Sequence, residues 1–293
     1  MGALLQAMLE PENVQQAWRR IRREHTPWCP GVERTELDYG LPQHLLRLME
    51  DLRRGSYRPE ALRQFAVNKG DGGRRIISAQ YLRDKLAQRM AFQVMEQRIE
   101  PFLHPDSFGY RRGRGVPHAL RRVRERVATG LVWAVDADIR SFFDRVPHHR
   151  IQRELNRFVD DRALRRLVGR WLQAGGHPAS LLARRRGVPQ GAVLSPLLCN
   201  VLLDHFDRAL ERAGIPFVRY ADDFLLLTAA REDAERARAH AEKCLARLGL
   251  ELHPQKTAVV RVSSKLQFLG EAVVRRRDRR GRALRQRGRS ESS

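Results

Sequence analysis

The sequence has few cysteines and no long apolar run, and both shortages narrow the class of protein. Its three cysteines, Cys29, Cys199 and Cys244, are far apart and form no CxxC pair. Scattered cysteines in odd number argue against a disulfide framework and against a zinc site. No stretch of about eighteen apolar residues is present, so we expect no membrane span. The first residues, MGALLQAMLEPENV, lack the segments of a secretory signal, and the simplest expectation is a cytoplasmic location.

Acidic residues are scarce relative to basic ones. Lysine and arginine number 56 against 34 Asp and Glu, which gives a formal net charge of +22. Only five of these 56 cations are lysine. A GC-rich genome would explain arginine over lysine, but it would not explain the excess of cations over acids. Such an excess favours a polyanionic partner, most commonly nucleic acid.

The spacing of the apolar residues predicts an α+β protein. A chain of 293 residues, 42% of them apolar, can bury one large or two modest cores. The expected helices lie at 12–55 (two, with a turn near Pro27, Pro30 and Gly31), 80–100, 148–174, 195–213 and 232–248. The expected strands form hairpins at 65–77 and 217–227, an alternating strand at 131–139 and a strand pair at 250–262. From residue 131 onward this order indicates helices packed on one antiparallel sheet.

Two short segments place acids where apolar side chains are expected. Asp138 lies near the end of the alternating strand, on the same face as Asp136, and Asp222 and Asp223 occupy the tip of the hairpin 217–227. A carboxylate within strand sequence is costly unless a cation pairs with it. Acids from two separate strands can converge on divalent metal ions, which prefer oxygen ligands. Such a metal pair promotes in-line phosphoryl transfer.

A structural interpretation of these acids remains open. They can instead cap turns or form ion pairs with nearby arginines such as Arg140 and Arg219, and for Asp136 this is the more natural interpretation. The segment 184–200, RRRGVPQGAVLSPLLCN, lies between the two acidic sites in the sequence. Its glycines allow close approach to a substrate backbone, and Ser195 followed by Pro196 is typical of a helix start.

Together these segments resemble the motifs of reverse transcriptases of the group II intron-like bacterial type. FVRYADDF resembles the YxDD box, VDADIRSFFDRVPH the first carboxylate motif, and GVPQGAVLSPLLCN the QGxxxSP block. Upstream, NKGDGGRRIIS, RDKLAQRM and SFGYRRGRG are similar to the fingers blocks, and downstream LGLELHPQKTAVV and FLG are similar to later palm motifs. The blocks follow the family's order and cover residues 12–270.

The resemblance implies an RNA-directed DNA polymerase and gives roles to the matching positions. Asp138, Asp222 and Asp223 would be catalytic and would hold two Mg²⁺ ions, for which Mn²⁺ can substitute. Lys256 would help the pyrophosphate leave, because an ammonium can give up a proton and a guanidinium effectively cannot. The implied substrate-binding residues are Lys69 and Arg75 for the incoming triphosphate, Gln190 and Gly191 for the nucleotide and template pocket, and Phe143 as a screen against the ribose 2′-hydroxyl.

The implied fold is a right-hand polymerase. N-terminal helices and fingers would occupy residues 1–130, and a palm with a ferredoxin-like antiparallel sheet and helices would occupy residues 131–272. Residues 273–293 would form a disordered basic tail, and the family's helical thumb would be absent or vestigial, because 23 residues follow Gly270. The implied partners are an RNA template, a DNA primer, deoxynucleoside triphosphates and a protein that supplies grip on the duplex, with no membrane.

The biological setting leaves several alternatives. The wording VWAVDADIRSFFD resembles the branch associated with CRISPR adaptation, which would make a CRISPR integrase the partner. Another defence role and a decayed intron reading frame are the alternative settings. The alternative functions are a non-catalytic, maturase-like RNA-binding cofactor and an RNA-templated RNA polymerase. Phe143 argues against the last, because a bulky ring there favours deoxynucleotides.

Overall fold

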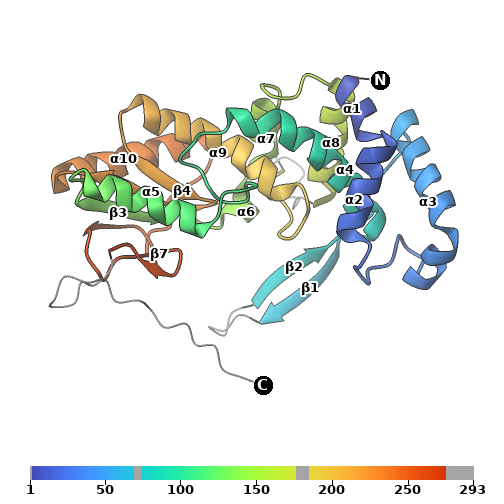
Figure 1. Ribbon diagram of the computed structural model, residues 1–293, viewed down its shortest axis with the longest axis horizontal. Helices are drawn as coiled ribbons and strands as arrows, with labels where there is room; N and C mark the ends of the chain where they lie inside the picture. The colour runs from blue at the N-terminus through green and yellow to red at the C-terminus, as the bar shows by residue number, and fades with distance from the viewer. Residues whose placement is uncertain (1, 69–73, 176–184, 275–293) are drawn as a thin grey trace. The chain divides into compact units, whose positions relative to one another are not determined.

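A computed structural model describes residues 2–68, 74–175 and 185–274 (Figure 1). Lys69 and residues 275–293 of the expected tail lie outside the described residues. The chain forms two compact units from alternating segments. The first contains Met1–His104, Arg140–Arg208 and Cys244–Glu251, and the second contains Pro105–Ile139, Ala209–Lys243 and Leu252–Ser293. The expected division after residues 130 and 272 stays a prediction.

The first unit is mainly helical. Its helices are α1 (Ala3–Met8), α2 (Pro11–Ile21), α3 (Arg34–Arg54), α4 (Leu82–Ile99), the 3₁₀ turn η1 (Glu100–Phe102), α6 (Phe142–Arg145), α7 (His148–Leu155) and α8 (Arg162–Gly175), while α9 (Ser195–Arg212) begins here and ends in the second unit. Helix α4 is central, because it buries residues on more than one face and both α1 and α2 pack against it. The two helices expected within 12–55 are confirmed as α2 and α3.

A buried polar network ties the segment before the first hairpin to α4 and α8. The Tyr57 hydroxyl donates a hydrogen bond to Asp84 Oδ1 at 2.6 Å, and Trp171 Nε1 donates to the Tyr57 hydroxyl at 3.0 Å. The backbone N–H of Glu60 donates to Asp84 Oδ2 at 2.8 Å. Burial raises the pKa of Asp84, and these donors oppose that rise. The network therefore fixes the chain just before it enters β1.

The expected hairpin at 65–77 is confirmed. Strands β1 (Arg63–Asn68) and β2 (Arg74–Ala79) pair antiparallel, with Phe65 opposite Ile77 and Arg75 opposite Val67. In Figure 1 the two strands form a ribbon that extends from the helices of this unit. The backbone of Arg75 is thus placed on the second strand of a two-stranded arm.

The helical structure expected at 148–174 is confirmed in part, because the chain forms two helices, α7 and α8, with a break between them. Asp161 starts the second helix: its Oδ1 accepts hydrogen bonds from the backbone N–H groups of Ala163 at 2.9 Å and Leu164 at 3.1 Å. Its other oxygen, Oδ2, accepts from the N–H of Leu5 at 2.8 Å. A buried carboxylate that caps one helix and binds another segment is a tertiary feature that apolar spacing does not reveal.

The second unit is built on one antiparallel sheet. Its elements are α5 (Val116–Ala128), β3 (Trp133–Asp138), β4 (Phe217–Tyr220), β5 (Asp223–Thr228), α10 (Arg231–Leu248, whose last turn belongs to the first unit), β6 (Ala258–Arg261), β7 (Gln267–Phe268) and β8 (Glu271–Ala272). The sheet order is β4-β5-β3-β6, with every neighbouring pair antiparallel. With α9 and α10 between strands, this is the βαββαβ order of ferredoxin-like sheets. The α+β expectation is confirmed.

Both faces of strand β3 are covered. Ala134 packs into a cluster with Leu225, Leu227 and residues of α5, while Val135, on the opposite face, is also fully buried. Strand β5 is buried from Phe224 to Thr228. Asp223 is the exposed residue of β5, and Asp136 and Asp138 are half-buried in β3, so solvent reaches the acids of both strands.

The strand pair expected at 250–262 is wrong in part. Only β6 forms as a strand, and it pairs with β3 rather than with its own neighbour in the sequence. Residue Leu252 makes a single bridge to Ile139 instead. This bridge leads the chain past the end of β3.

Within the described residues, no helix is long and apolar enough to cross a membrane.

Candidate active site

The register of the sheet brings the sequence-distant acids together. Asp138, the last residue of β3, and Asp223, the first residue of β5, are Cα partners in the antiparallel ladder. Asp222 precedes Asp223 in the turn between β4 and β5. Because directly opposed residues have Cβ atoms about 4.5–5.5 Å apart, the three carboxylates share one end of the sheet.

The electrostatics of these acids show an unmet demand for positive charge. Desolvation, followed by the charges of Asp138 and Asp222, raises the pKa of Asp223 to about 6. The pKa of Asp222 is also raised, mainly by desolvation and further by the charge of Asp138. Asp136 is half-buried and lies on the same face of β3 as Asp138. Desolvation alone raises its pKa. A cation at this end of the sheet would relieve the repulsion.

Lys256 supplies part of that charge. Its Nζ donates a hydrogen bond to Asp138 Oδ2 at 2.6 Å, and the hydrogen bond with Asp138 raises the pKa of the Lys256 ammonium. The backbone holds this lysine in place: the N–H of His253 donates to the Asp138 carbonyl at 2.8 Å, and the N–H of Lys256 donates to the His253 carbonyl at 3.1 Å. Lys256 is thus a tethered cation beside three acids.

The donor set suits a hard divalent cation, although it is not arranged as a finished metal site. Asp138, Asp222 and Asp223 offer only carboxylate oxygens, the ligands that Mg²⁺ prefers. Across residues 2–68, 74–175 and 185–274, no group of three His, Cys, Asp or Glu side chains is positioned to hold a metal ion. One oxygen of Asp138 is engaged by Lys256 instead. The residues therefore fit Mg²⁺ by the chemistry of their oxygen donors.

A buried arginine shapes the hairpin tip. Arg219 is fully buried; its Nη1 donates to the Ala221 carbonyl at 2.9 Å and its Nη2 donates to Ser107 Oγ at 2.7 Å. Ala221 has a positive φ of 59°, a conformation that costs an L-residue energy unless its surroundings hold it. Arg219 therefore holds the turn and joins it to Ser107, and its charge also opposes the rise in the pKa of Asp222.

A short segment before α5 completes the support of the tip. The N–H of Phe108 donates to the Arg219 carbonyl at 2.8 Å, and the N–H of Arg219 donates to the Asp106 carbonyl at 2.9 Å. At Gly109 an added Cβ would lie 2.3 Å from the backbone nitrogen of Ala221. The glycine therefore permits a backbone contact that no other residue allows.

The predicted substrate-binding residues lie in the first unit. Phe143 is half-buried in α6, its ring packs edge-on against Phe142 at 5.5 Å, and its carbonyl accepts a hydrogen bond from the N–H of Val188 at 2.7 Å. This bond ties α6 to the loop that carries Gln190 and Gly191, where Gly191 has a positive φ of 92°. Neither these residues nor Arg75 belongs to the unit of the three acids.

Expectations for the start of α9 and for the partner of Arg140 also came from the sequence. Helix α9 begins at Ser195 as expected, and the Ser195 hydroxyl donates to the Pro189 carbonyl at 2.8 Å, which closes the loop onto the helix start. Arg140 pairs with Glu251 at 3.0 Å rather than with the acids of the hairpin.

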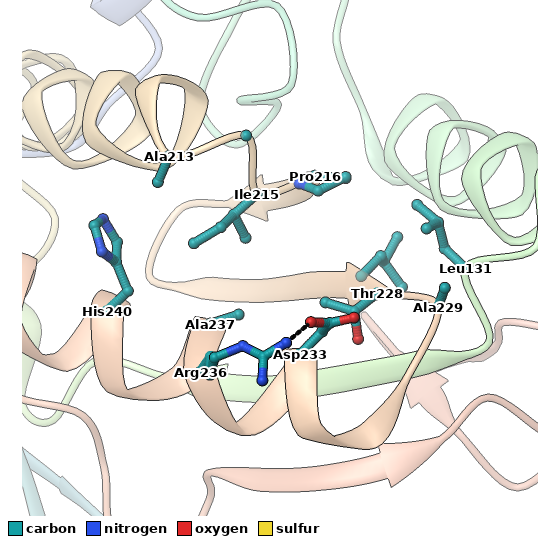
Figure 2. A pocket seen from close by; sticks show the side chains of 12 residues that line it. Leu131, Ala213, Ile215, Pro216, Thr228, Ala229, Asp233, Arg236, Ala237 and His240 are labelled. Atoms are coloured by element: carbon teal, nitrogen blue, oxygen red, sulfur yellow. Dashed lines mark hydrogen bonds and ion pairs between the residues drawn. The ribbon is translucent and has the colours of Figure 1, made fainter.

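A hollow of about 460 Å³ in the second unit is not part of this site. Figure 2 shows it between the end of α9, the start of β4 and helix α10, with the Asp233–Arg236 ion pair and His240 along one helix. It reaches Thr228, the last residue of β5, whereas Asp223 is the first. The acids and the hollow therefore lie at opposite ends of the strand.

Comparison with known proteins identifies the family of the chain. Residues 67–273 match the family described as "Reverse transcriptase (RNA-dependent DNA polymerase)". The chain is 30% identical to the protein YkfC of Escherichia coli strain K12, covering 95% of this chain and 84% of YkfC. It is 25% identical to the group II intron-encoded protein LtrA of Lactococcus lactis subsp. cremoris, over 74% of this chain but only 36% of LtrA.

A solved structure with a similar fold is the apo telomerase of Candida tropicalis truncated from its C-terminal domain. It aligns with a TM-score of 0.54 and 15% identity, and the alignment covers 72% of this chain and 52% of the telomerase chain. At this identity the likeness concerns the fold alone.

Proposed function

The chain belongs to the reverse transcriptase family, whose members are RNA-directed DNA polymerases, and from that premise we propose that Asp138, Asp222 and Asp223 are its polymerase site. The observation that carries this assignment is the pairing of Asp138 with Asp223 at one end of the sheet, with Lys256 bound to Asp138. The substrates are an RNA template, a DNA primer and deoxynucleoside triphosphates, and the product is complementary DNA.

The three carboxylates would orient the reacting groups through divalent cations. Two Mg²⁺ ions, for which Mn²⁺ can substitute, would stabilise the attacking and leaving oxygens of the transfer. Asp138, Asp222 and Asp223 would hold these ions, and their mutual repulsion would favour cation binding. Lys256 donates a proton from Nζ to the departing pyrophosphate, a step that guanidinium groups cannot perform.

The remaining predicted residues select and position the nucleotide. Arg75 contacts the incoming triphosphate together with Lys69, which lies outside the described residues. Gln190 and Gly191 line the pocket for the base pair, and Phe143 screens the ribose 2′-hydroxyl. The bond between Val188 and Phe143 supports this proposal, because it links the pocket loop to the helix that carries the screen.

The test compares Asp222→Asn with Asp233→Asn, a control on α10 whose carboxylate pairs with Arg236. A DNA primer annealed to RNA is extended with deoxynucleotides and Mg²⁺, and RNA binding is measured separately with the metal chelated. Asp222→Asn should abolish extension, keep RNA binding nearly unchanged and retain or raise the melting temperature, because a repelling charge is removed. Normal extension by this variant would refute the site.

The alternative of a non-catalytic, maturase-like RNA-binding cofactor predicts a different result. In that case the unmodified chain would bind RNA tightly but incorporate no nucleotide with either metal. The tethered lysine beside three acids supports the enzyme instead, because simple RNA binding has no need of negative charge at one spot.

The setting of the reaction is also part of the proposal. Spacer acquisition from RNA, beside a CRISPR integrase that grips the duplex, is supported by the resemblance of VWAVDADIRSFFD to that branch. Another defence role is the alternative. Affinity purification of the chain from its own host decides between them: an integrase in the purified complex supports spacer acquisition, and its absence under conditions that retain bound nucleic acid contradicts it.

A further inference from the structure

We propose that a cleft in the first unit binds one nucleotide of a single-stranded nucleic acid, at a place that uses none of the proposed polymerase residues. The cleft has a volume of about 310 Å³. It is formed by the end of α4, the turn η1, the segment after α7 and the middle of α9, and its lining residues are Arg98, Phe102, Arg157, Phe158, Asp204 and Arg208.

Two phenylalanines give the cleft an aromatic surface. The rings of Phe102 and Phe158 lie 6.1 Å apart at an interplanar angle of 52°. Phe158 is buried, whereas Phe102 leaves 55% of its surface in solvent. The backbone that carries Phe102 is fixed, because Arg208 Nη2 donates to its carbonyl at 2.7 Å. An exposed ring on a fixed backbone is a stacking platform with one face uncovered.

The rim of the cleft is basic because its acids are buried beneath it. Asp204 is nearly inaccessible and accepts from the N–H of His104 at 3.2 Å, and Arg208 Nε lies 3.5 Å from the same carboxylate. Glu154, also buried, pairs with Arg157 at 2.9 Å. The guanidinium groups of Arg157 and Arg208 remain partly exposed, and Arg98 is exposed at the end of α4.

The arginines are also oriented by the aromatic rings. Arg157 lies over the Phe158 ring, with its guanidinium carbon 5.3 Å from the centroid. Buried carboxylates and an aromatic face thus fix two of the three cations before any ligand arrives, which lowers the entropy lost on binding. The exposed surface of the cleft is therefore an aromatic ring with positively charged side chains around it.

This combination fits a nucleotide better than other occupants. Each nucleotide presents a flat π face for Phe102 and a phosphate for the arginines, and neither contact depends on base identity. An acidic peptide could satisfy the cations but would leave the ring uncovered unless it also carried an aromatic side chain at the right spacing. The chain's net charge of +22 also favours nucleic acid over protein.

The experiment measures binding of a fluorescein-labelled single-stranded RNA to the full chain by anisotropy, with metal chelated and salt varied. Phe102→Ala should weaken binding roughly tenfold, the size expected for one stacked base, and Phe102→Trp should retain wild-type binding. Arg98→Gln should reduce the slope of log affinity against log salt by about 0.7, the value for one phosphate contact on a single strand.

Matched controls come from exposed residues of α3 in the same unit. Tyr39→Ala removes an aromatic side chain that is 93% exposed, and Arg53→Gln removes an exposed arginine. Both should bind RNA like the wild type. Asp222→Asn should also bind like the wild type, so a failure of the proposed polymerase site is distinguished from a failure of the cleft.

Two results would overturn the proposal. One is wild-type RNA affinity and salt dependence in both Phe102→Ala and Arg98→Gln. The other is tight binding of a labelled oligoglutamate peptide that Phe102→Ala abolishes while RNA binding stays intact, because that would assign the cleft to an acidic protein segment.

Discussion

The guanidinium of Arg219 donates a hydrogen bond to the carbonyl of Ala221, the residue directly before Asp222, at 2.9 Å. Arg219 is fully buried, and its second amino group reaches Ser107 on a distant segment. The turn that carries Asp222 is thus held by a buried side chain.

Arg219→Lys should lower both stability and turnover. A single ammonium cannot reproduce the two hydrogen bonds of the fork, and losing one partner of a buried polar group costs about 1–3 kcal/mol. We expect a lower melting temperature and a reduced kcat for single-nucleotide extension, with little change in KM for the nucleotide. Arg236→Lys on α10, where the arginine is exposed, is the control and should change neither quantity.

Gly109→Ala should displace the hairpin tip through a steric clash. The added methyl would meet the backbone nitrogen of Ala221 at 2.3 Å, and backbone cannot yield as a flexible side chain can. Extension should fall sharply, together with the melting temperature. In Gly40→Ala the nearest atoms, from His44, are at 3.4 Å, so this control should be close to neutral. Full activity of Gly109→Ala would show that the tip does not depend on this contact.

Phe143→Ala should relax the choice between ribonucleotides and deoxynucleotides. If the half-buried ring screens the 2′-hydroxyl, its removal should raise the ratio of kcat/KM for ribonucleotides to that for deoxynucleotides by roughly tenfold or more. Phe142→Leu is the control, because Phe142 is a core residue with only 3% of its surface exposed. That variant should lose stability without changing the ratio. An unchanged ratio in Phe143→Ala would remove the screen from the proposal.

Two variants of Lys256 should distinguish its role in balancing charge from its role as a proton donor. Lys256→Arg keeps a cation beside Asp138, so the melting temperature should stay near that of the wild type, whereas Lys256→Gln should lower it by leaving the acids less compensated. The rate of the chemical step should fall in both variants, roughly 10²-fold if Lys256 is the general acid. Rapid-quench measurement of a single incorporation gives this rate. Full recovery of the rate by arginine would contradict proton donation.

His148 should make stability depend on pH below neutrality. Its Nε2 donates to the Gly187 carbonyl at 2.6 Å, and burial lowers the pKa of His148 below its ordinary 6.5. The unfolded chain therefore binds a proton more readily, and the free energy of unfolding should decrease as pH falls from about 7 to about 5. Asp223, with a pKa raised to about 6, contributes with the opposite sign over this range.

The pH effect of His148 is isolated by comparison with His148→Gln, which keeps a donor but does not titrate. As pH falls, the free energy of unfolding of the wild type should decrease more than that of His148→Gln. Denaturant titrations at several pH values measure it. Parallel curves for the two proteins would mean that His148 is not responsible.

The sequence by itself determined which residues could form the proposed polymerase site. Acids in apolar strand sequence, at Asp138 and at Asp222–Asp223, are costly to bury and therefore stand out, and a lysine in an arginine-rich chain identifies Lys256 by its chemistry. Apolar alternation also predicted β3 and the β4–β5 hairpin, because local spacing decides which faces can be buried. These features are encoded within short stretches of chain.

Only the tertiary structure decided how those stretches are held. The burial of Arg219 and its hydrogen bond to the Ala221 carbonyl could not be predicted from local sequence. Burial of a guanidinium depends on partners such as Ser107 that are distant in sequence. Asp161 starts α8 through the nearby N–H groups of Ala163 and Leu164, whereas its contact with Leu5 is made only by the fold. Hydrogen bonds between distant segments leave no periodic signal, whereas burial of a strand or helix face does.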